Sequence, residues 1–142
     1  MRKLYFAYGS NMNPKQMHRR CPNSRPVAQA KIRNYKVAIN SRGVATIVPS
    51  KGDAVSGVVW KISPSDEFRL DCFEGVKCGI YLKKEISASF GNNTKTKVLV
   101  YIDRVSDMGM PREGYLEKVI RGVRHFKLGE DYISNLERLA YA

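Results

Sequence analysis

The first two thirds of the chain alternate between short apolar runs and clusters of turn-forming residues, a pattern typical of β-strands. The Gly-Asn-Asn-Thr stretch at 91–94 predicts a hairpin, and the Pro-Ser-Lys-Gly-Asp stretch at 49–53 predicts a turn between two strands. The strands that we expect cover 4–8, 27–33, 35–40, 44–48, 55–62, 80–90 and 95–102.

Helices are predicted where capping residues precede apolar positions at helical spacing. The Asn-Pro pair at 13–14 begins a short helix through Arg20, because Asn caps a helix and Pro suits its first turn. The Ser-Pro pair at 63–64 begins a second helix, which stops at Gly75. Two further helices are expected over 112–126 and roughly 130–141.

Size and composition favour one domain over residues 1–142. The 142 residues are 43% hydrophobic, which is enough for one core. The elements predict an α+β fold, in which a small mixed sheet curls toward a partly closed β-barrel with flanking helices. No apolar run reaches the roughly 20 residues of a membrane span, and the N-terminus does not resemble a signal peptide. We therefore expect a cytoplasmic protein that makes no membrane contact.

Charge is unevenly distributed along the chain. There are 25 Lys and Arg against 13 Asp and Glu, a net charge of +12, and no acidic residue precedes Asp53. Such a basic segment could bind nucleic acid, steer small anions, or only face solvent. Because no sequence signature of nucleic-acid recognition accompanies the charge, nucleic acid is not the expected partner.

The cysteines and histidines do not form a recognisable site. Cys21, Cys72 and Cys78 are an odd number without CxxC spacing, so we expect free thiols and no zinc. Cys72 has no histidine in a partnering motif, and we expect it to pack in the core. His18 and His125 are flanked by basic residues and should be exposed. We assign neither a metal nor a cofactor.

The segment Tyr8-Gly9-Ser10-Asn11 lies at a strand end just before a helix. Glycine allows unusual backbone angles and lets a ligand approach the main chain. Successive N–H groups in such a turn can bind an anion. The same residues also suit an ordinary turn, so the pattern leaves both interpretations open.

Glu74 follows Phe73 at the end of the second predicted helix, where the negative pole of the helix dipole disfavours a carboxylate. If its side chain also lined a pocket, its pKa would rise and the group would suit a general base. The alternative is a surface glutamate at a frayed helix end.

Several segments together resemble the γ-glutamylcyclotransferase family. "LYFAYGSNM" (4–12) resembles its glutamyl-binding loop, "ATIVPSKGDAVSGVVWKI" (45–62) its central strands, and "LDCFEGVKCGIYLKKEI" (70–86) the segment with its catalytic glutamate. "MPREGYLEKVIRG" (110–122) resembles its terminal helix. YGSN, GVVW and EGVKxGxY in this order make a specific combination.

The resemblance implies that Glu74 is the catalytic acid/base and that a small γ-glutamyl substrate is cyclised to 5-oxoproline without a cofactor. Tyr81 and Tyr115 would contact the substrate. The γ-glutamyl group would be received by a wall and turn made of Tyr5, Phe6, Ala7, Tyr8, Gly9, Ser10 and Asn11.

Two points stay open at the level of sequence. The segment between Ile39 and Val44 is short, so the substrate could be a γ-glutamyl amino acid, a γ-glutamyl amine or a γ-glutamyl-tagged natural product. The alternatives to an enzyme are a catalytically silent metabolite-binding relative and a basic nucleic-acid-binding module. A homodimer is one arrangement that the sequence allows.

Overall fold

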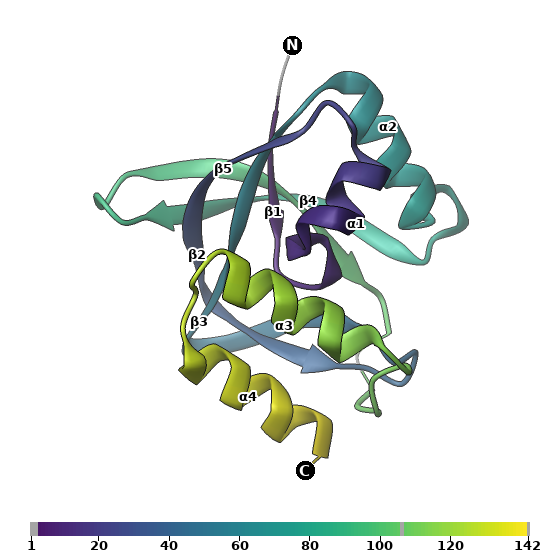
Figure 1. Ribbon diagram of the computed structural model, residues 1–142, viewed down its shortest axis with the longest axis vertical. Coiled ribbons are helices and arrows are strands. Elements are labelled where there is room, and N and C mark those ends of the chain that lie inside the picture. The colour runs from purple at the N-terminus through teal and green to yellow at the C-terminus, as the bar shows by residue number, and fades with distance from the viewer. Residues whose placement is uncertain (1–2, 106, 142) are drawn as a thin grey trace.

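The computed structural model describes residues 3–105 and 107–141 (Figure 1). None of the helices within these ranges is long and apolar enough to cross a membrane. The elements are β1 (Lys3–Ala7), η1 (Ser10–Met12), α1 (Pro14–Arg20), β2 (Arg25–Ile39), β3 (Ala45–Ile62), α2 (Pro64–Phe73), η2 (Val76–Cys78), β4 (Tyr81–Phe90), β5 (Lys95–Asp103), α3 (Tyr115–His125) and α4 (Glu130–Tyr141), where η marks a 3₁₀ turn.

The five strands form a closed barrel in the order β1-β3-β2-β4-β5. Neighbouring strands are antiparallel except β1 and β5, which pair in parallel at Tyr5 and Leu99. Strands β2 and β4 pair through two residue pairs, Ala30 with Phe90 and Lys31 with Ser89, and the β4–β5 turn projects away from the barrel (Figure 1). The predicted α+β fold with a curled mixed sheet is confirmed. The barrel is closed, whereas the sequence predicted a partly closed one.

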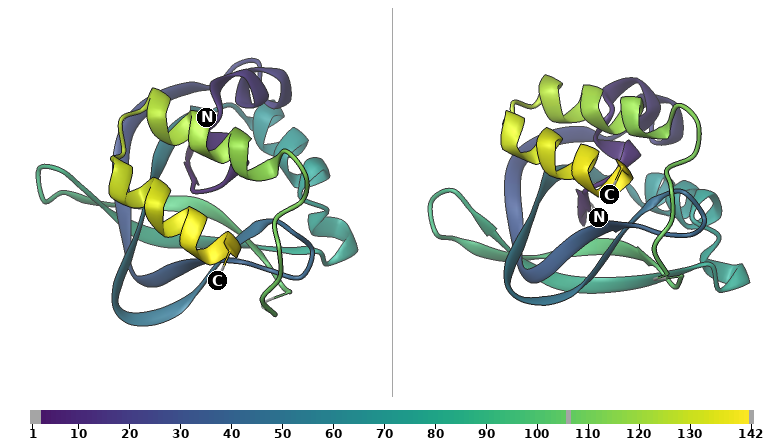
Figure 2. Two further views of the ribbon diagram at one scale, coloured as in Figure 1. Left: turned by 60° about the horizontal axis from the view of Figure 1, so that its bottom comes forward. Right: turned by 90° about the horizontal axis from the view of Figure 1, so that it is seen from below.

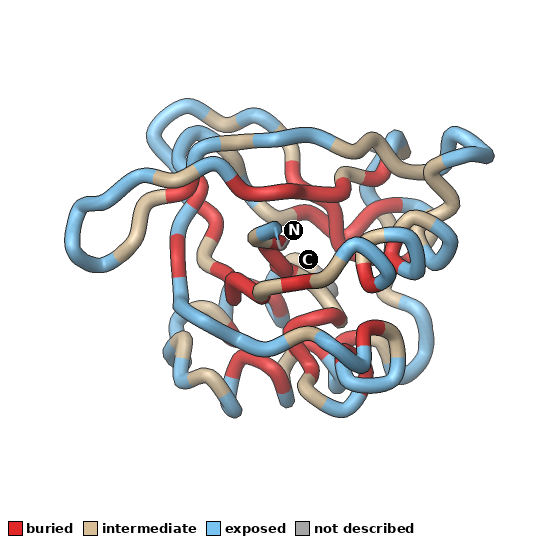
Figure 3. The backbone as a smooth tube through the Cα atoms, turned by 90° about the horizontal axis from the view of Figure 1, so that it is seen from above, coloured by how far each residue is buried: buried red, intermediate tan, exposed pale blue. Residues whose placement is uncertain are grey.

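Strand alternation divides the core into two layers. Successive residues of a strand point to opposite faces, so Phe6 fills the barrel interior while Tyr5 packs under the helices. Figure 3 shows the buried segments gathered in the middle of the molecule and exposed residues at the loop tips. The layer between the barrel and the helices, to which Tyr5 belongs, also includes Trp60 from β3 and Leu70 from α2.

Strands β2 and β3 differ from the prediction, which divided each into two. The residues expected to form a turn at 49–53 instead lie inside β3, where the pairing with β2 shifts register between Arg33 and Tyr35. Asn34, with a φ of 68°, lies opposite, and its side-chain oxygen accepts a hydrogen bond from the Gly52 N–H at 3.2 Å. Turn-forming residues can bend a strand without ending it when the partner strand bends beside them.

The predicted helices are present, and two of them have the expected caps. Asn13 accepts a hydrogen bond from Gln16 N at the start of α1, and Ser63 with Asp66 forms a capping box on α2. Helices α3 and α4 lie side by side on one side of the barrel (Figure 2). Gly122 lets α3 approach η1 closely, because an added Cβ would lie 2.5 Å from a backbone atom of Met12.

The prediction that Cys72 packs in the core is wrong. Helix α2 buries Asp66 and Leu70, which are four residues apart on one face. Cys72 lies two residues beyond Leu70, on a different face of the helix, and is exposed. All three cysteines are free, and His18 and His125 are exposed as expected.

Candidate active site

A cavity of about 280 Å³ opens where η1, the end of α2, the start of β4 and the start of α3 meet. The N-terminal segment contributes Tyr5, Tyr8, Gly9, Ser10 and Asn11 to its wall. Glu74, Tyr81 and Tyr115 approach it from three other elements. The volume suits a small ligand.

Helix α2 ends at the cavity and places Glu74 there. Glu74 is the C-cap residue, and its N–H donates to the Leu70 carbonyl at 2.8 Å. Gly75 follows in the left-handed conformation with a φ of 63°, which turns the chain away and leaves the Glu74 side chain at the cavity wall. A β-branched residue in place of Gly75 would be strained in this conformation.

Burial raises the pKa of Glu74 from 4.5 to about 7, an effect that the guanidinium groups of Arg20 and Arg42 oppose and the Asp103 carboxylate supports. A carboxyl with this pKa is partly ionised near neutral pH. It can therefore both accept and return a proton under the same conditions.

A hydrogen-bond network holds the Tyr8–Asn11 turn in shape. The Asn11 side-chain amide donates to the Tyr5 hydroxyl at 2.9 Å, and its oxygen accepts from Gln16 at 2.9 Å and from Arg20 at 3.1 Å. Gln16 also donates to the Ser10 hydroxyl at 2.7 Å. Because Asn11 and Gln16 are buried, these bonds fix both side chains.

Tyr115 closes the cavity from the first turn of α3. Its hydroxyl accepts a hydrogen bond from the Ala45 N–H at 3.0 Å and also hydrogen-bonds with Ser10. An added Cβ at Gly9 would lie 2.8 Å from the same hydroxyl, so a side chain there would displace it. Burial raises the pKa of Tyr115 above 10.0, and the phenol stays protonated.

Two arginines lie on aromatic rings beside Glu74. The Arg20 guanidinium is 4.8 Å from the centroid of the Phe73 ring, and the Arg42 guanidinium is 5.7 Å from that of Tyr81. Arg42 also forms an ion pair with the buried carboxylate of Asp103. These contacts hold both cations at the cavity wall.

The structure brings most of the predicted site residues together. Phe6 and Ala7 are the exceptions: both are buried and neither lines the cavity, Phe6 because alternation along β1 directs it into the barrel. The predicted residues that line the cavity are Tyr5, Tyr8, Gly9, Ser10, Asn11, Glu74, Tyr81 and Tyr115.

Sequence reasoning missed ten residues of the cavity wall, namely Gln16, Arg20, Arg42, Val44, Ala45, Phe73, Tyr101, Arg112, Glu113 and Lys118. Gln16 and Arg20 lie four residues apart on α1, and the helical spacing behind Asn11 was the one signal that could have identified them. Arg42 lies in the turn between β2 and β3, and Tyr101 lies on β5; only the tertiary fold brings the two to the cavity. Among the described residues, no group of three or more His, Cys, Asp or Glu could hold a metal ion.

Comparison with known proteins gives consistent matches. The model of the AIG2-like family matches residues 54–136. The γ-glutamylcyclotransferases of Homo sapiens and Mus musculus are 31% and 30% identical to this chain, in each case over 96% of this chain and 78% of the relative. A solved γ-glutamyl cyclotransferase structure superimposes with a TM-score of 0.89 at 30% identity, covering 96% of this chain and 87% of that one.

Proposed function

Because this chain belongs to the γ-glutamylcyclotransferase family, we propose that it cyclises a γ-glutamyl amide to 5-oxoproline, with Glu74 as the acid and base. The observation that carries this role is a carboxyl group with a pKa of about 7 at the wall of a small polar cavity. Both the cavity and the protonation behaviour fit a reaction that needs proton transfer near neutral pH.

The reaction is intramolecular. The α-amine of the glutamyl unit attacks its own γ-carbonyl carbon, the five-membered lactam forms, and the bond from that carbon to the leaving nitrogen breaks. The enzyme needs no covalent intermediate if it holds the glutamyl unit of the substrate in the folded conformer. Well-oriented intramolecular attack reaches effective concentrations of about 10⁵ to 10⁸ M.

Glu74 carries a proton from the attacking nitrogen to the leaving nitrogen in this proposal. Its carboxylate accepts a proton from the α-ammonium, which frees the lone pair for attack. The protonated carboxyl then gives this proton to the leaving nitrogen. The attacking nitrogen loses a second proton as it becomes the lactam N–H, and the departing amine takes it up, so Glu74 ends ionised as it began.

The turn opposite Glu74 binds the glutamyl unit in this proposal. Backbone N–H groups from Gly9 to Asn11 would hold the α-carboxylate or the developing oxyanion. The network around Asn11 keeps this turn rigid, and Tyr115 and Tyr81 cover the folded substrate. Rigid donors cost no reorganisation during the reaction.

The test is release of 5-oxoproline from γ-glutamyl-alanine, measured by mass spectrometry for the wild type and for Glu74→Gln. The substitution keeps the shape and removes the titrating group, so the rate should fall by about 10²- to 10⁴-fold. Glu117→Gln is the matched control, since Glu117 is exposed on α3 and does not line the cavity. Equal rates for wild type and Glu74→Gln would remove Glu74 from the mechanism.

A further inference from the structure

Positive charge surrounds the cavity. Four cationic side chains line it, namely Arg20, Arg42, Arg112 and Lys118, against the two carboxyl groups of Glu74 and Glu113. Arg42 is neutralised by Asp103. Within the described part of the chain, Arg20, Arg112 and Lys118 have no ion pair with a carboxylate. Three unneutralised cations therefore share the cavity with Glu113 and a Glu74 that is only partly ionised near neutral pH.

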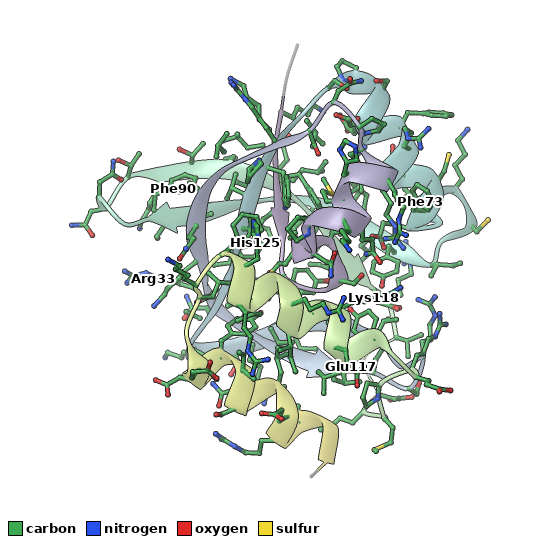
Figure 4. The ribbon with its side chains drawn as sticks, viewed as in Figure 1. Arg33, Phe73, Phe90, Glu117, Lys118 and His125 are labelled. Carbon is green, nitrogen blue, oxygen red and sulfur yellow. The ribbon has the colours of Figure 1, made fainter. Side chains whose placement is uncertain are left out.

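Two of these cations lie at the mouth of the cavity. Arg112 and Lys118 are exposed, whereas Tyr5 and Tyr8 at the inner wall are buried. Arg112, Tyr115 and Lys118 follow each other at intervals of three residues, and all three line the cavity. In Figure 4, Lys118 lies on the side of α3 toward α2 and Phe73, and Glu117 is on the other side of the helix.

The position of Arg112 is fixed by the turn between β2 and β3. Its backbone N–H donates to the Gly43 carbonyl at 2.9 Å, and its Nε donates to the Arg42 carbonyl at 2.7 Å. An added Cβ at Gly43 would lie 2.6 Å from Cγ of Arg112, so only glycine lets this side chain lie here. Arg112 is therefore held near the mouth by backbone contacts, while Lys118 lines the mouth with an exposed side chain.

Glu74 faces the inner wall of the cavity, because its charge acts on the hydroxyl groups of the buried Tyr5 and Tyr8, which line the same cavity. This position determines which part of a substrate meets Arg112 and Lys118. The reacting carbonyl and both nitrogens must come to Glu74, so the glutamyl unit occupies the inner part of the cavity. The rest of the leaving group then extends toward the mouth, past Arg112 and Lys118. Because the glutamyl unit carries one ammonium and one carboxylate, it does not neutralise the surplus positive charge.

We propose that Arg112 and Lys118 select γ-glutamyl substrates whose leaving group has a negatively charged side chain, such as γ-glutamyl-glutamate, over neutral and cationic ones. The inference rests on the proposed cyclotransferase function and adds the substrate class. A cationic leaving group such as a diamine would bring its charge against the same two side chains and bind poorly.

The expected effect is modest because both cations are exposed. Ion pairs at a protein surface contribute about 0.2–1 kcal/mol each, which corresponds to a factor of up to about 5 in kcat/KM. Two such pairs together predict a preference of about 2- to 30-fold for an acidic side chain on the leaving group over an isosteric neutral one. Salt should weaken it, since the screening length falls from about 30 Å at 0.01 M to about 3 Å at 1 M.

The experiment compares 5-oxoproline release from γ-glutamyl-glutamate, γ-glutamyl-glutamine and γ-glutamyl-lysine. Glutamate and glutamine have the same shape and the same α-carboxylate, so the ratio of their kcat/KM values isolates the charge of the side chain. The wild type should rank them glutamate, glutamine, lysine, and Lys118→Glu should bring the glutamate-to-glutamine ratio to about one or below. Arg121→Glu is the control, because Arg121 is exposed on α3 and does not line the cavity, and it should keep the wild-type ratio.

The outcomes separate the two proposals. Release from γ-glutamyl-glutamine at a rate equal to or above that from γ-glutamyl-glutamate would keep the cyclotransferase function and overturn the charge selection. A ratio that Lys118→Glu leaves unchanged would overturn the role of Lys118 in the same way. No release from any of the three substrates would overturn the function itself, and the selection with it.

Discussion

Replacing Glu74 by glutamine should make the protein more stable at alkaline pH while it removes activity. Burial raises the pKa of Glu74 to about 7 in the folded state, whereas the ordinary value of 4.5 applies to the unfolded chain. Between these two pH values the folded state binds more protons than the unfolded state. The free energy of unfolding must therefore fall as the pH rises from 4.5 through about 7.

The magnitude follows from the two pKa values. A difference of one pKa unit is worth about 1.4 kcal/mol, so the change from 4.5 to about 7 corresponds to about 3 kcal/mol. This is an upper value, because water that enters the cavity solvates the carboxylate. Glutamine is neutral at every pH and lacks this cost, so Glu74→Gln should gain up to about 3 kcal/mol over the wild type above pH 8. Near pH 4.5 the two proteins should be equally stable.

Urea denaturation at about pH 5 and pH 8.5 measures this difference, with Trp60 as the reporter. Trp60 is buried and is the only tryptophan of the chain, so its fluorescence should change on unfolding. Glu117→Gln serves as the exposed control and should show no pH-dependent difference from the wild type. A stability difference between Glu74→Gln and the wild type that is the same at both pH values would refute a buried, proton-exchanging Glu74.

Three further predictions concern the surroundings of Glu74. Arg20→Gln removes a charge that lowers the Glu74 pKa, so the ascending limb of the pH profile of kcat/KM should move to higher pH; an unmoved limb would contradict the coupling. Tyr115→Phe leaves the buried Ala45 N–H without its acceptor, which should cost about 1–3 kcal/mol in thermal unfolding experiments and lower kcat/KM. Gly122→Ala should separate α3 from η1, with a loss of about 1–3 kcal/mol and of activity together, and an active, fully stable variant would argue against this contact.

Local patterns along the chain were sufficient for the elements and for part of the candidate site. The caps at Asn13 and Ser63 predict where α1 and α2 begin, because a cap depends on residues within one helical turn. Glu74 and Gly75 predict the end of α2 in the same way. The glycine-containing segment at 8–11 and Glu74 were identified from residue types and from the family resemblance, and the fold then placed them at one cavity.

Tertiary structure alone decided what surrounds these residues. Arg42 reaches the cavity from the turn between β2 and β3, and Tyr101 reaches it from β5. The two are far apart in the sequence, and no local pattern records that the folded barrel brings them together. The register shift between β2 and β3 involves Asn34, which lies in another strand from the turn-forming residues at 49–53. A local pattern therefore predicted a turn where β3 continues. The pKa of Glu74 also depends on packing, since burial by distant segments raises it. The sequence by itself determined where most helices and strands form and which side chains are available for proton transfer. The distances between these side chains, their burial and the charges around them were decided only by the tertiary structure, because they depend on segments far apart in the chain.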